Sequence, residues 1–460
     1  MDERGRPATL ARACLSEQAR AGGVGVLLVV PIGFVDGGLA PRSWAWLTIA
    51  LAAAAGIGLL LLPWPRPCSE AIVALAALGG LAALAAASAA WAVQGASPWL
   101  EARRTSLYLA GLSAVLVLVT ARTRRALLVG LLAGVSSVVG WGLVDRVAHG
   151  TGAPDRFSGT LLRDPIGYPN ALGLLAATGA LLALGLAACE RRAPARRALS
   201  AVAYVLLVAL SLTESRGAAL ALLAGFVIAL AFAAPGQRTA LLREAVTVLP
   251  LAVLAALVAA RAGSLALALV LAVGAVASAA LPRLARPRHV VVLAALGSTL
   301  AVLALVVHPP SATSSYRGEY WRAALEAAAD RPLLGAGAGS FDALWLEYRT
   351  VGVDVRDAHS LYVEVLAELG PPGLALVLCL VGAPLVAAVR RRGDPDAWIA
   401  AGGFAVFAVH AGLDWDWEIP VVTLAALGCA GALLLSRPGS DGLTGVRGTR
   451  SVKRTARGEG

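Results

Sequence analysis

The feature that most constrains this chain is the repetition of apolar runs of roughly 17 to 23 residues, the length that a helix needs to cross the hydrocarbon layer of a membrane. Hydrophobic residues make up 58% of the 460 residues, and charged residues make up only 15%. A soluble domain could not bury so much apolar surface. Because lipid offers no hydrogen-bond partners, the backbone of each run must satisfy itself within a helix. The sequence therefore predicts an all-α polytopic integral membrane protein.

Fourteen candidate spans can be placed along the chain. The first, the eighth and the closely spaced ninth and tenth have the weakest patterns, so we expect about 12–14 transmembrane helices. The candidates lie near residues 22–37, 43–63, 71–94, 105–121, 127–147, 166–188, 199–214, 216–234, 246–262, 264–282, 290–309, 361–389, 397–413 and 418–436.

The distribution of basic residues orients these spans. With the N-terminus in the cytoplasm, most of the 39 lysines and arginines fall in cytoplasmic segments, as the positive-inside rule requires. This rule, rather than nucleic-acid binding, accounts for the net charge of +11. Met1–Arg20 has no signal-peptide cleavage site, so we expect the first span to be retained. We predict a cytoplasmic N-terminus, a transmembrane bundle, a large extracytoplasmic loop, C-terminal transmembrane helices and a basic, disordered cytoplasmic tail that touches anionic lipid, at residues 1–21, 22–309, 310–359, 360–436 and 437–460.

The large outward loop contains one predicted helix. Residues 320–329 place Trp321, Leu325 and Ala328 on one face, and Arg322 lies at i,i+4 spacing from an acidic residue on another. This pattern is typical of a short amphipathic helix that lies among lipid headgroups. Arginine is normally depleted on this side of the membrane. The presence of Arg317 beside Arg322 therefore suggests phosphate binding, for which a guanidinium offers a planar fork of donors.

The stretch "GAGAGSF", residues 335–341, resembles a nucleotide-binding glycine loop only superficially, since no strand precedes it. We interpret it as a flexible turn. None of the five cysteines lies in the large outward loop, and the chain has no CxxC or HExxH spacing. We expect no disulfide framework, no metal and no cofactor.

Two further outward turns carry charged residues. "SLTESRGAALA", residues 211–221, places Arg216 between two apolar runs, either as an arginine that reaches to the interface or as a functional cation. "RFSGTLLRDPIGYPNALG" leads into the sixth span, where Asn170 is positioned to cap the helix. Arg156 and Arg163 of that stretch could add to a basic outer surface.

"HAGLDWDWEIP", residues 410–420, closes another outward hairpin. Its two tryptophans fit the aromatic belt at the membrane boundary, and His410 lies within a span and should face protein. The three acidic residues could order the loop, bind sugar hydroxyls or hold a cation. They are Asp414, Asp416 and Glu418.

His359 follows the large loop and precedes an apolar helix. Its imidazole is therefore expected at the outer boundary between water and lipid. A histidine in this position is either structural or a base, because its ordinary pKa lies near neutrality. Asp357 or Glu364 could orient the ring.

The order of these pieces resembles the O-antigen ligase/polymerase family, polytopic enzymes of bacterial surface polysaccharide assembly. The similarity runs from about residue 156 to 420. It rests on "SRG" between two spans, "RGEYWRAAL" and "RPLLGAGAGSF" in the outer loop, and "HSLYVEVLAELGPPGL" entering a helix. It implies a metal-independent, inverting glycosyltransferase at the outer face of the bacterial cytoplasmic membrane. The donor would be a polyprenyl-diphosphate-linked glycan, and the acceptor a glycan, a lipid or a protein.

The resemblance also implies residue roles. Arg216 and Arg317 would stabilise charge on the departing diphosphate, and His359 would take the proton from the acceptor hydroxyl. The substrate-binding candidates are Arg322, Glu319, Arg156, Arg163 and Asp414. The chain departs from the family where Ser360 replaces a common asparagine and where paired prolines follow residue 370, which would alter only a helix kink.

Two other functions remain open at this point. A flippase for a lipid-linked glycan, or another transporter, would carry polar residues at mid-membrane depth and paired internal repeats. A structural or polymer-sensing membrane protein would not need its outward arginines. The clustering of polar residues at outer helix ends favours the enzyme.

Overall fold

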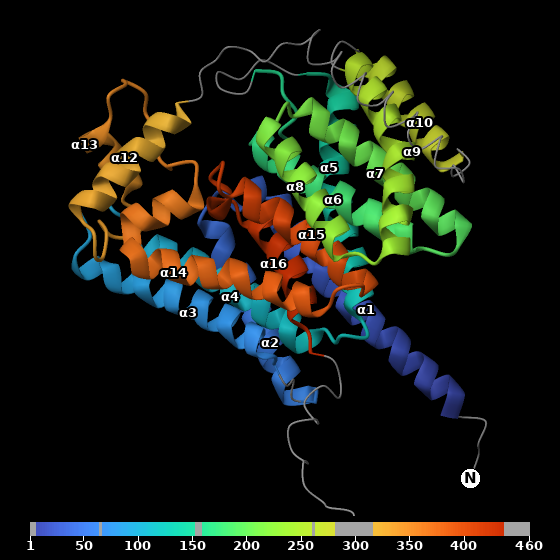
Figure 1. The fold of residues 1–460 in the computed structure, drawn as a ribbon, viewed down its shortest axis with the longest axis horizontal. Coiled ribbons are helices and arrows are strands. Elements are labelled where there is room, and N and C mark those ends of the chain that lie inside the picture. The colour runs from blue at the N-terminus through green and yellow to red at the C-terminus, as the bar shows by residue number, and fades with distance from the viewer. Residues whose placement is uncertain (1–5, 64–66, 152–158, 260–262, 281–315, 437–460) are drawn as a thin grey trace, which may run out of the picture.

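The computed structural model describes residues 6–63, 67–151, 159–259, 263–280 and 316–436. Within these ranges the chain forms helices and no strand, which confirms the predicted all-α membrane fold (Figure 1). The candidate span 290–309, the basic tail and Arg156 lie outside the described residues.

Fifteen α-helices are described, and three short 3₁₀ helices (η1–η3) lie in turns between them. The α-helices are α1 (Arg6–Gly33), α2 (Arg42–Leu61), α3 (Ser69–Ala87), α4 (Pro98–Leu118), α5 (Arg124–His149), α6 (Pro169–Cys189), α7 (Ala193–Leu212), α8 (Arg216–Phe232), α9 (Pro235–Ala259), α10 (Ser264–Ala280), α12 (Arg317–Asp330), α13 (Phe341–Tyr348), α14 (Leu361–Arg390), α15 (Pro395–His410) and α16 (Pro420–Leu434).

Among the described helices, seven are long and apolar enough to cross a membrane: α2, α3 with η2 (Ser88–Ala90), α5, α6, α7, α9 and α14. Three shorter apolar helices accompany them: α8, α10 and α16. Every candidate span except 290–309 coincides with a helix, although α1 and α9 begin many residues before the predicted spans.

Helix α6 forms the centre of the bundle. Its apolar window is 89% buried, against 28% for α2, so α6 is enclosed by protein whereas α2 offers its side chains to lipid. Helices α5, α7, α8, α9 and α15 pack around it. In Figure 1, α2, α3, α4 and α14 run side by side along one edge, and α12 and α13 lie at the opposite side of the molecule from the N-terminal end of α1.

Glycines let several helices approach until their backbones touch, as in other membrane bundles. A Cβ built on Gly25 of α1 would lie 2.6 Å from the carbonyl oxygen of Leu127 in α5, and one on Gly130 would overlap the carbonyl of Gly22. The α1–α5 pair therefore depends on glycine at these positions.

The outer loop differs from its prediction in two ways. The predicted helix exists as α12, but a second helix, α13, follows it. In addition, the face of α12 that packs on protein is Tyr320, Ala323, Ala324 and Ala327, whereas Leu325 remains 51% exposed. Trp321 of the predicted face also packs partly against this buried cluster, so Leu325 is the residue of that face that stays exposed.

Helix α14 is two helical segments joined at Gly370, where φ is +64° and ψ is −168°. A Cβ at this position would lie 2.5 Å from the carbonyl oxygen of Leu333, so only glycine allows the outer loop to pack against the break. The expected single kinked span is instead a short outer segment followed by a long apolar one.

The contact between α1 and α5 can be tested with a matched pair of variants. Gly130→Ala should lower the thermal midpoint of the purified protein, since the added methyl group meets the Gly22 backbone at a cost of about 1–3 kcal/mol. Gly140→Ala in the same helix meets nothing within 4 Å and should hold or raise the midpoint through better helix propensity. The midpoints are measured by tryptophan fluorescence during heating. Equal midpoints for the two variants would contradict the close contact between α1 and α5.

Candidate active site

One buried carboxylate, that of Asp414, gathers the candidate residues at the end of the bundle that carries the outer loop. Its side chain is 1% exposed and is 3.0 Å from the Arg317 guanidinium and 3.9 Å from Nε2 of His359. The hydroxyl of Tyr168 donates to it at 2.9 Å, and the amide of Asn170 donates at 2.6 Å. The structure therefore brings together two of the three predicted catalytic residues, one from α12 and one from the loop before α14.

The backbone at His359 is held in the left-handed region, at φ +56°. Non-glycine residues rarely adopt this conformation, and it is found preferentially where a side chain must be aimed at a functional site. Here Glu364 fixes the turn by accepting the backbone N–H of Ala358 at 2.6 Å. The ring is therefore positioned by its main chain, and Asp357 orients it through its carbonyl rather than through its carboxylate.

That carbonyl also settles which ring nitrogen carries the proton. Nδ1 of His359 lies 3.0 Å from the Asp357 carbonyl oxygen, which can only accept a hydrogen bond. In the neutral ring Nδ1 is thus the donor, and the lone pair is on Nε2, toward Asp414. With a side chain 20% exposed, Nε2 is placed to take a proton, and the resulting imidazolium would face a carboxylate.

Arg317 is the first residue of α12, where the helix dipole disfavours a cation. Its pairing with Asp414 offsets this cost, and 32% of its side chain stays exposed. The rings of Tyr320 and Trp415 flank His359, with centroids 5.2 and 6.4 Å from it. The site thus combines an imidazole, flanked by two aromatic rings, with a partly exposed cation.

Arg216 stands apart from this cluster. It opens α8, directly after Ser215, whose side chain caps the helix by accepting from Ala218. Its exposed side chain lines an open hollow of about 300 Å³ together with Leu207, Leu210, Ser211, Glu214, Ser215 and Ala219. Within the described residues, no hydrogen bond or ion pair joins Arg216 to Asp414.

The remaining predicted binding residues have other contacts. Arg322 pairs with Glu319 at 3.1 Å and Glu326 at 2.7 Å, the second being the predicted i,i+4 pair, and donates to the Tyr348 carbonyl of α13. The hydroxyl of Thr350, just after α13, donates to Glu319 at 2.6 Å, so both candidates fasten α12 to the end of α13 and the residues that follow it. Arg163 lies in the turn before α6, where its carbonyl accepts from Gly167. Their roles in substrate binding stay predictions.

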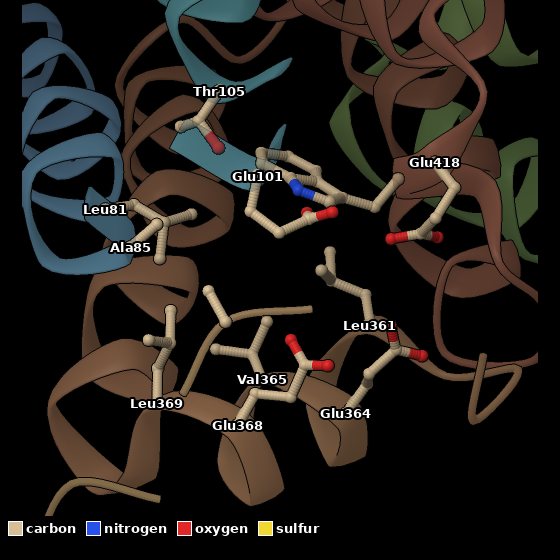
Figure 2. Close-up of a pocket in the computed structure, with 12 residues that line it drawn as sticks. Leu81, Ala85, Glu101, Thr105, Leu361, Glu364, Val365, Glu368, Leu369 and Glu418 are labelled. Atoms are coloured by element: carbon tan, nitrogen blue, oxygen red, sulfur yellow. The ribbon is translucent and has the colours of Figure 1, made fainter. Parts of the chain in front are cut away.

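In addition to Asp414, the structure contains a cluster of acidic side chains. A small cavity of about 20 Å³, room for one water molecule, is lined by four glutamates: Glu101, Glu364, Glu368 and Glu418 (Figure 2). Arg104 of α4 supplies a positive charge, since it pairs with Glu101 and lies 3.4 Å from Glu418.

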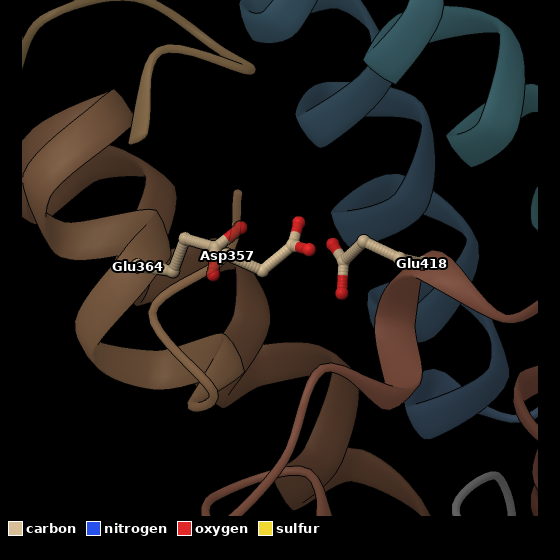
Figure 3. A group of neighbouring side chains, drawn as sticks. All are labelled: Asp357, Glu364 and Glu418. Carbon is tan, nitrogen blue, oxygen red and sulfur yellow. The ribbon is translucent and has the colours of Figure 1, made fainter. Parts of the chain in front are cut away.

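Three carboxylates of this group come from different elements and converge. The oxygen atoms of Asp357, Glu364 and Glu418 lie within 4.8 Å of one another (Figure 3). Among the described residues, this trio has the spacing that a metal ion would need. Burial raises the pKa of Asp357 to about 6, although Arg104 and His359 oppose the shift, and burial also raises the pKa of Glu418. Protons therefore stabilise the group at mildly acid pH.

Sequence reasoning missed the partners of Asp414. Asn170 is not the cap of α6, because the residue before the helix is Tyr168 and the Asn170 amide binds Asp414 instead. Burial raises the pKa of Tyr168, so its phenol stays protonated and donates. The "YPN" triplet looked like an ordinary helix start, and only the fold reveals that it faces a residue 244 positions away.

The glycine stretch is not a flexible turn. The Glu368 carboxylate accepts the backbone N–H groups of Gly339, Ser340 and Phe341 at 2.7–2.9 Å. Gly335, Gly337 and Gly339 all have positive φ, and Cβ atoms on the first two would clash with neighbouring chain. The stretch is a fixed turn whose glycines let α14 and the segment after α3 approach.

Residues 201–378 match the family model described as O-Antigen ligase. This part of the chain is therefore similar to O-antigen ligases. The match includes Arg216, Arg317 and His359 and ends before Asp414. Among curated proteins, no sequence matches the chain. The match supports a role in polysaccharide assembly. In the structure, two of the three predicted catalytic residues meet at the Asp414 carboxylate.

The acidic trio predicts a dependence of stability on pH. The pKa of Asp357 rises from its ordinary value of 3.8 to about 6 in the folded protein, so the stability present below the ordinary pKa is lost progressively as the pH rises through about 6. Asp357→Asn should therefore raise the thermal midpoint at pH 8 by about 2 °C, raise it less at about pH 5, and leave it nearly unchanged at about pH 3.5. Asp354→Asn is the control, because that side chain in the same loop is 94% exposed. If the thermal midpoints of wild type and Asp357→Asn changed in parallel with pH, the proposed cost of a charge on Asp357 would be contradicted.

Proposed function

We propose that the protein is a glycosyltransferase of the O-antigen ligase type. It transfers a glycan from a polyprenyl diphosphate to an acceptor hydroxyl at the outer face of the bacterial cytoplasmic membrane, with both termini in the cytoplasm. The observation that carries the proposal is the Arg317–Asp414–His359 cluster, which sets a base with a free Nε2 lone pair beside a half-exposed guanidinium. The family match over residues 201–378 supports the same class.

In the proposed reaction, the acceptor oxygen attacks the anomeric carbon of the donor sugar. Nε2 of His359 takes the hydroxyl proton as the new carbon–oxygen bond forms. The bond between the anomeric carbon and the diphosphate oxygen breaks, and the electron pair leaves with the polyprenyl diphosphate. Attack opposite the leaving group inverts the anomeric centre. The protonated imidazole then faces the Asp414 carboxylate, which stabilises it.

The leaving diphosphate gains negative charge, and cations must be in place before it departs. Arg317 can serve because about a third of its side chain is exposed and it shares the Asp414 carboxylate with the proposed base. Arg216 can serve because it stands over a hollow whose other walls include Leu207, Leu210 and Ala219. Such a hollow suits a phosphate attached to an isoprenoid chain. Asp414 has its oxygens occupied by protein donors, so we propose that it positions Arg317 and His359 rather than binding sugar.

The alternative, transport of a lipid-linked glycan, would require polar groups that can be reached from both sides of the membrane. The Asp414 cluster and the four-glutamate cavity both lie at the end of the bundle that meets the outer loop. This location favours chemistry at one face. Movement of the donor lipid across vesicles without formation of a glycosylated product would favour the transporter.

The base can be tested by glycan transfer in nanodiscs, with polyprenyl-diphosphate glycan as donor and a mixture of candidate acceptors. His359→Gln keeps a polar side chain but lacks the base, so transfer should fall by roughly 10²–10⁴-fold. His149→Gln is the matched control, since that histidine is 76% exposed and pairs with Asp145 of its own helix. EDTA should leave wild-type transfer unchanged. Full activity of His359→Gln would remove the proposed base, and loss with EDTA would contradict metal independence.

The cation can be tested by a conservative change at two similar arginines. Arg317 and Arg349 both lie 3.0 Å from an aspartate and have side chains 32% and 33% exposed. Arg317→Lys should reduce transfer at least tenfold, since lysine cannot reproduce the planar fork, whereas Arg349→Lys should change it less than about twofold. Equal effects of the two substitutions would show that Arg317 has only a structural role.

A further inference from the structure

A buried pair that the proposed reaction does not use joins the two separated parts of the site. His410, the last residue of α15, and Asp416 are both fully buried, and Nδ1 of the histidine lies 2.6 Å from the aspartate carboxylate. Among the described residues, Nε2 of His410 and the second oxygen of Asp416 have no hydrogen-bond partner. Desolvating two ionisable groups is costly, and an apolar pair of similar volume would stabilise the bundle at least as well. The pair therefore calls for a role other than stability.

The position of the ring indicates that role. A Cβ built on Gly217 would lie 3.0 Å from Nε2 of His410 and 3.2 Å from its Cδ2. The imidazole edge thus rests on the first turn of α8, one residue beyond Arg216. Because Ser215 caps this turn, the backbone that carries Arg216 is fixed against the ring.

The two helices behind this contact, α8 and α15, pack closely. A Cβ on Gly225 of α8 would lie 2.5 Å from the Val406 side chain and 2.7 Å from the Gly402 carbonyl oxygen of α15. At the other end of the pair, Asp416 lies two residues from Asp414, and its carbonyl accepts the Thr423 hydroxyl at 2.9 Å. A continuous chain of contacts therefore runs from the Asp414 turn through Asp416 and His410 to the start of α8.

We propose that His410 and Asp416 are positioning residues that hold Arg216 at a fixed place relative to Arg317 and His359. The inference rests on the proposed diphosphate-binding role of Arg216. Neither residue touches the substrate. The His410 ring fixes the position of the first turn of α8, and Asp416 fixes the orientation of the ring.

The test measures binding of geranylgeranyl diphosphate, with geranylgeraniol as the probe that lacks phosphate, to the full-length protein in nanodiscs. His410→Asn retains a donor at the position of Nδ1 for Asp416 but removes the ring edge from Gly217. It should weaken diphosphate binding roughly tenfold, which corresponds to a coupling of about 1.4 kcal/mol. Gly217→Ala should weaken it similarly, by pushing α8 away from an intact pair. Binding of geranylgeraniol should not change.

Coupling to Arg216 separates positioning from general damage. In an Arg216→Gln background, His410→Asn should cause less than about a twofold further loss, because the cation that it positions is gone. The Gly217→Ala/His410→Asn double variant should bind better than the product of the single effects, since asparagine leaves room for the methyl group. A loss from His410→Asn that is equal with and without Arg216 would overturn the inference, as would unchanged binding by both single variants.

Failure of the proposed function gives a different result. If the wild-type protein does not bind geranylgeranyl diphosphate more tightly than the alcohol, the diphosphate role of Arg216 is wrong, and the positioning inference is wrong with it. If the wild type does so and Arg216→Gln weakens binding, the proposed role of Arg216 stands, and the His410 variants alone decide the inference. A thermal midpoint for every variant shows whether each remains folded.

Discussion

The arrangement of the candidate site depends on the burial of the Asp414 carboxylate. A charge taken out of water must be compensated by donors and cations, and Asp414 receives them from α6, α12 and the loop before α14. The position of each donor is therefore fixed by its interaction with the same carboxylate. Tyr168 and Asn170 donate to the carboxylate from the start of α6. Arg317 and His359 approach the same two oxygens, and part of each of their side chains stays exposed, where we propose that it acts on a substrate.

The glycine stretch repeats the same principle in the outer loop. Successive backbone N–H groups in a tight, glycine-rich turn form a concave anion site, and nucleotide-binding loops place a phosphate there. In this protein the anion is the chain's own Glu368 carboxylate, which accepts three consecutive N–H groups. The likeness to a nucleotide loop therefore has a physical basis, although the turn serves to attach α14 to the outer loop. The break at Gly370 lies directly after this anchor.

The sequence could predict features that depend on local pattern or on motif order. Apolar runs locate the helices, and the family resemblance points to Arg317 and His359. It could not predict contacts between residues far apart in the chain, such as Asn170 with Asp414, because a polar residue at a helix start has the same local appearance whether it caps the helix or binds a distant carboxylate. Helix α13 was missed for a related reason. Its eight residues are too short for a periodic pattern, and it is stabilised by Phe341 and Trp345 packing onto α12 and the loop before α14.

The segment from His410 to Glu418 contacts charged groups of the candidate site on several different elements. Asp414 holds Arg317 and faces His359, the His410–Asp416 pair abuts the helix of Arg216, and Glu418 lies near Arg104 and Asp357. Yet the family match ends at residue 378, before this segment begins. Residues that act on a substrate need particular atoms in particular places, and they leave a recognisable motif. Carboxylates that position them need only reach the right donors, which the fold can arrange from several backbone positions. The matched region therefore contains the residues that we propose to react, whereas the residues that we propose to position them are found only from the three-dimensional packing.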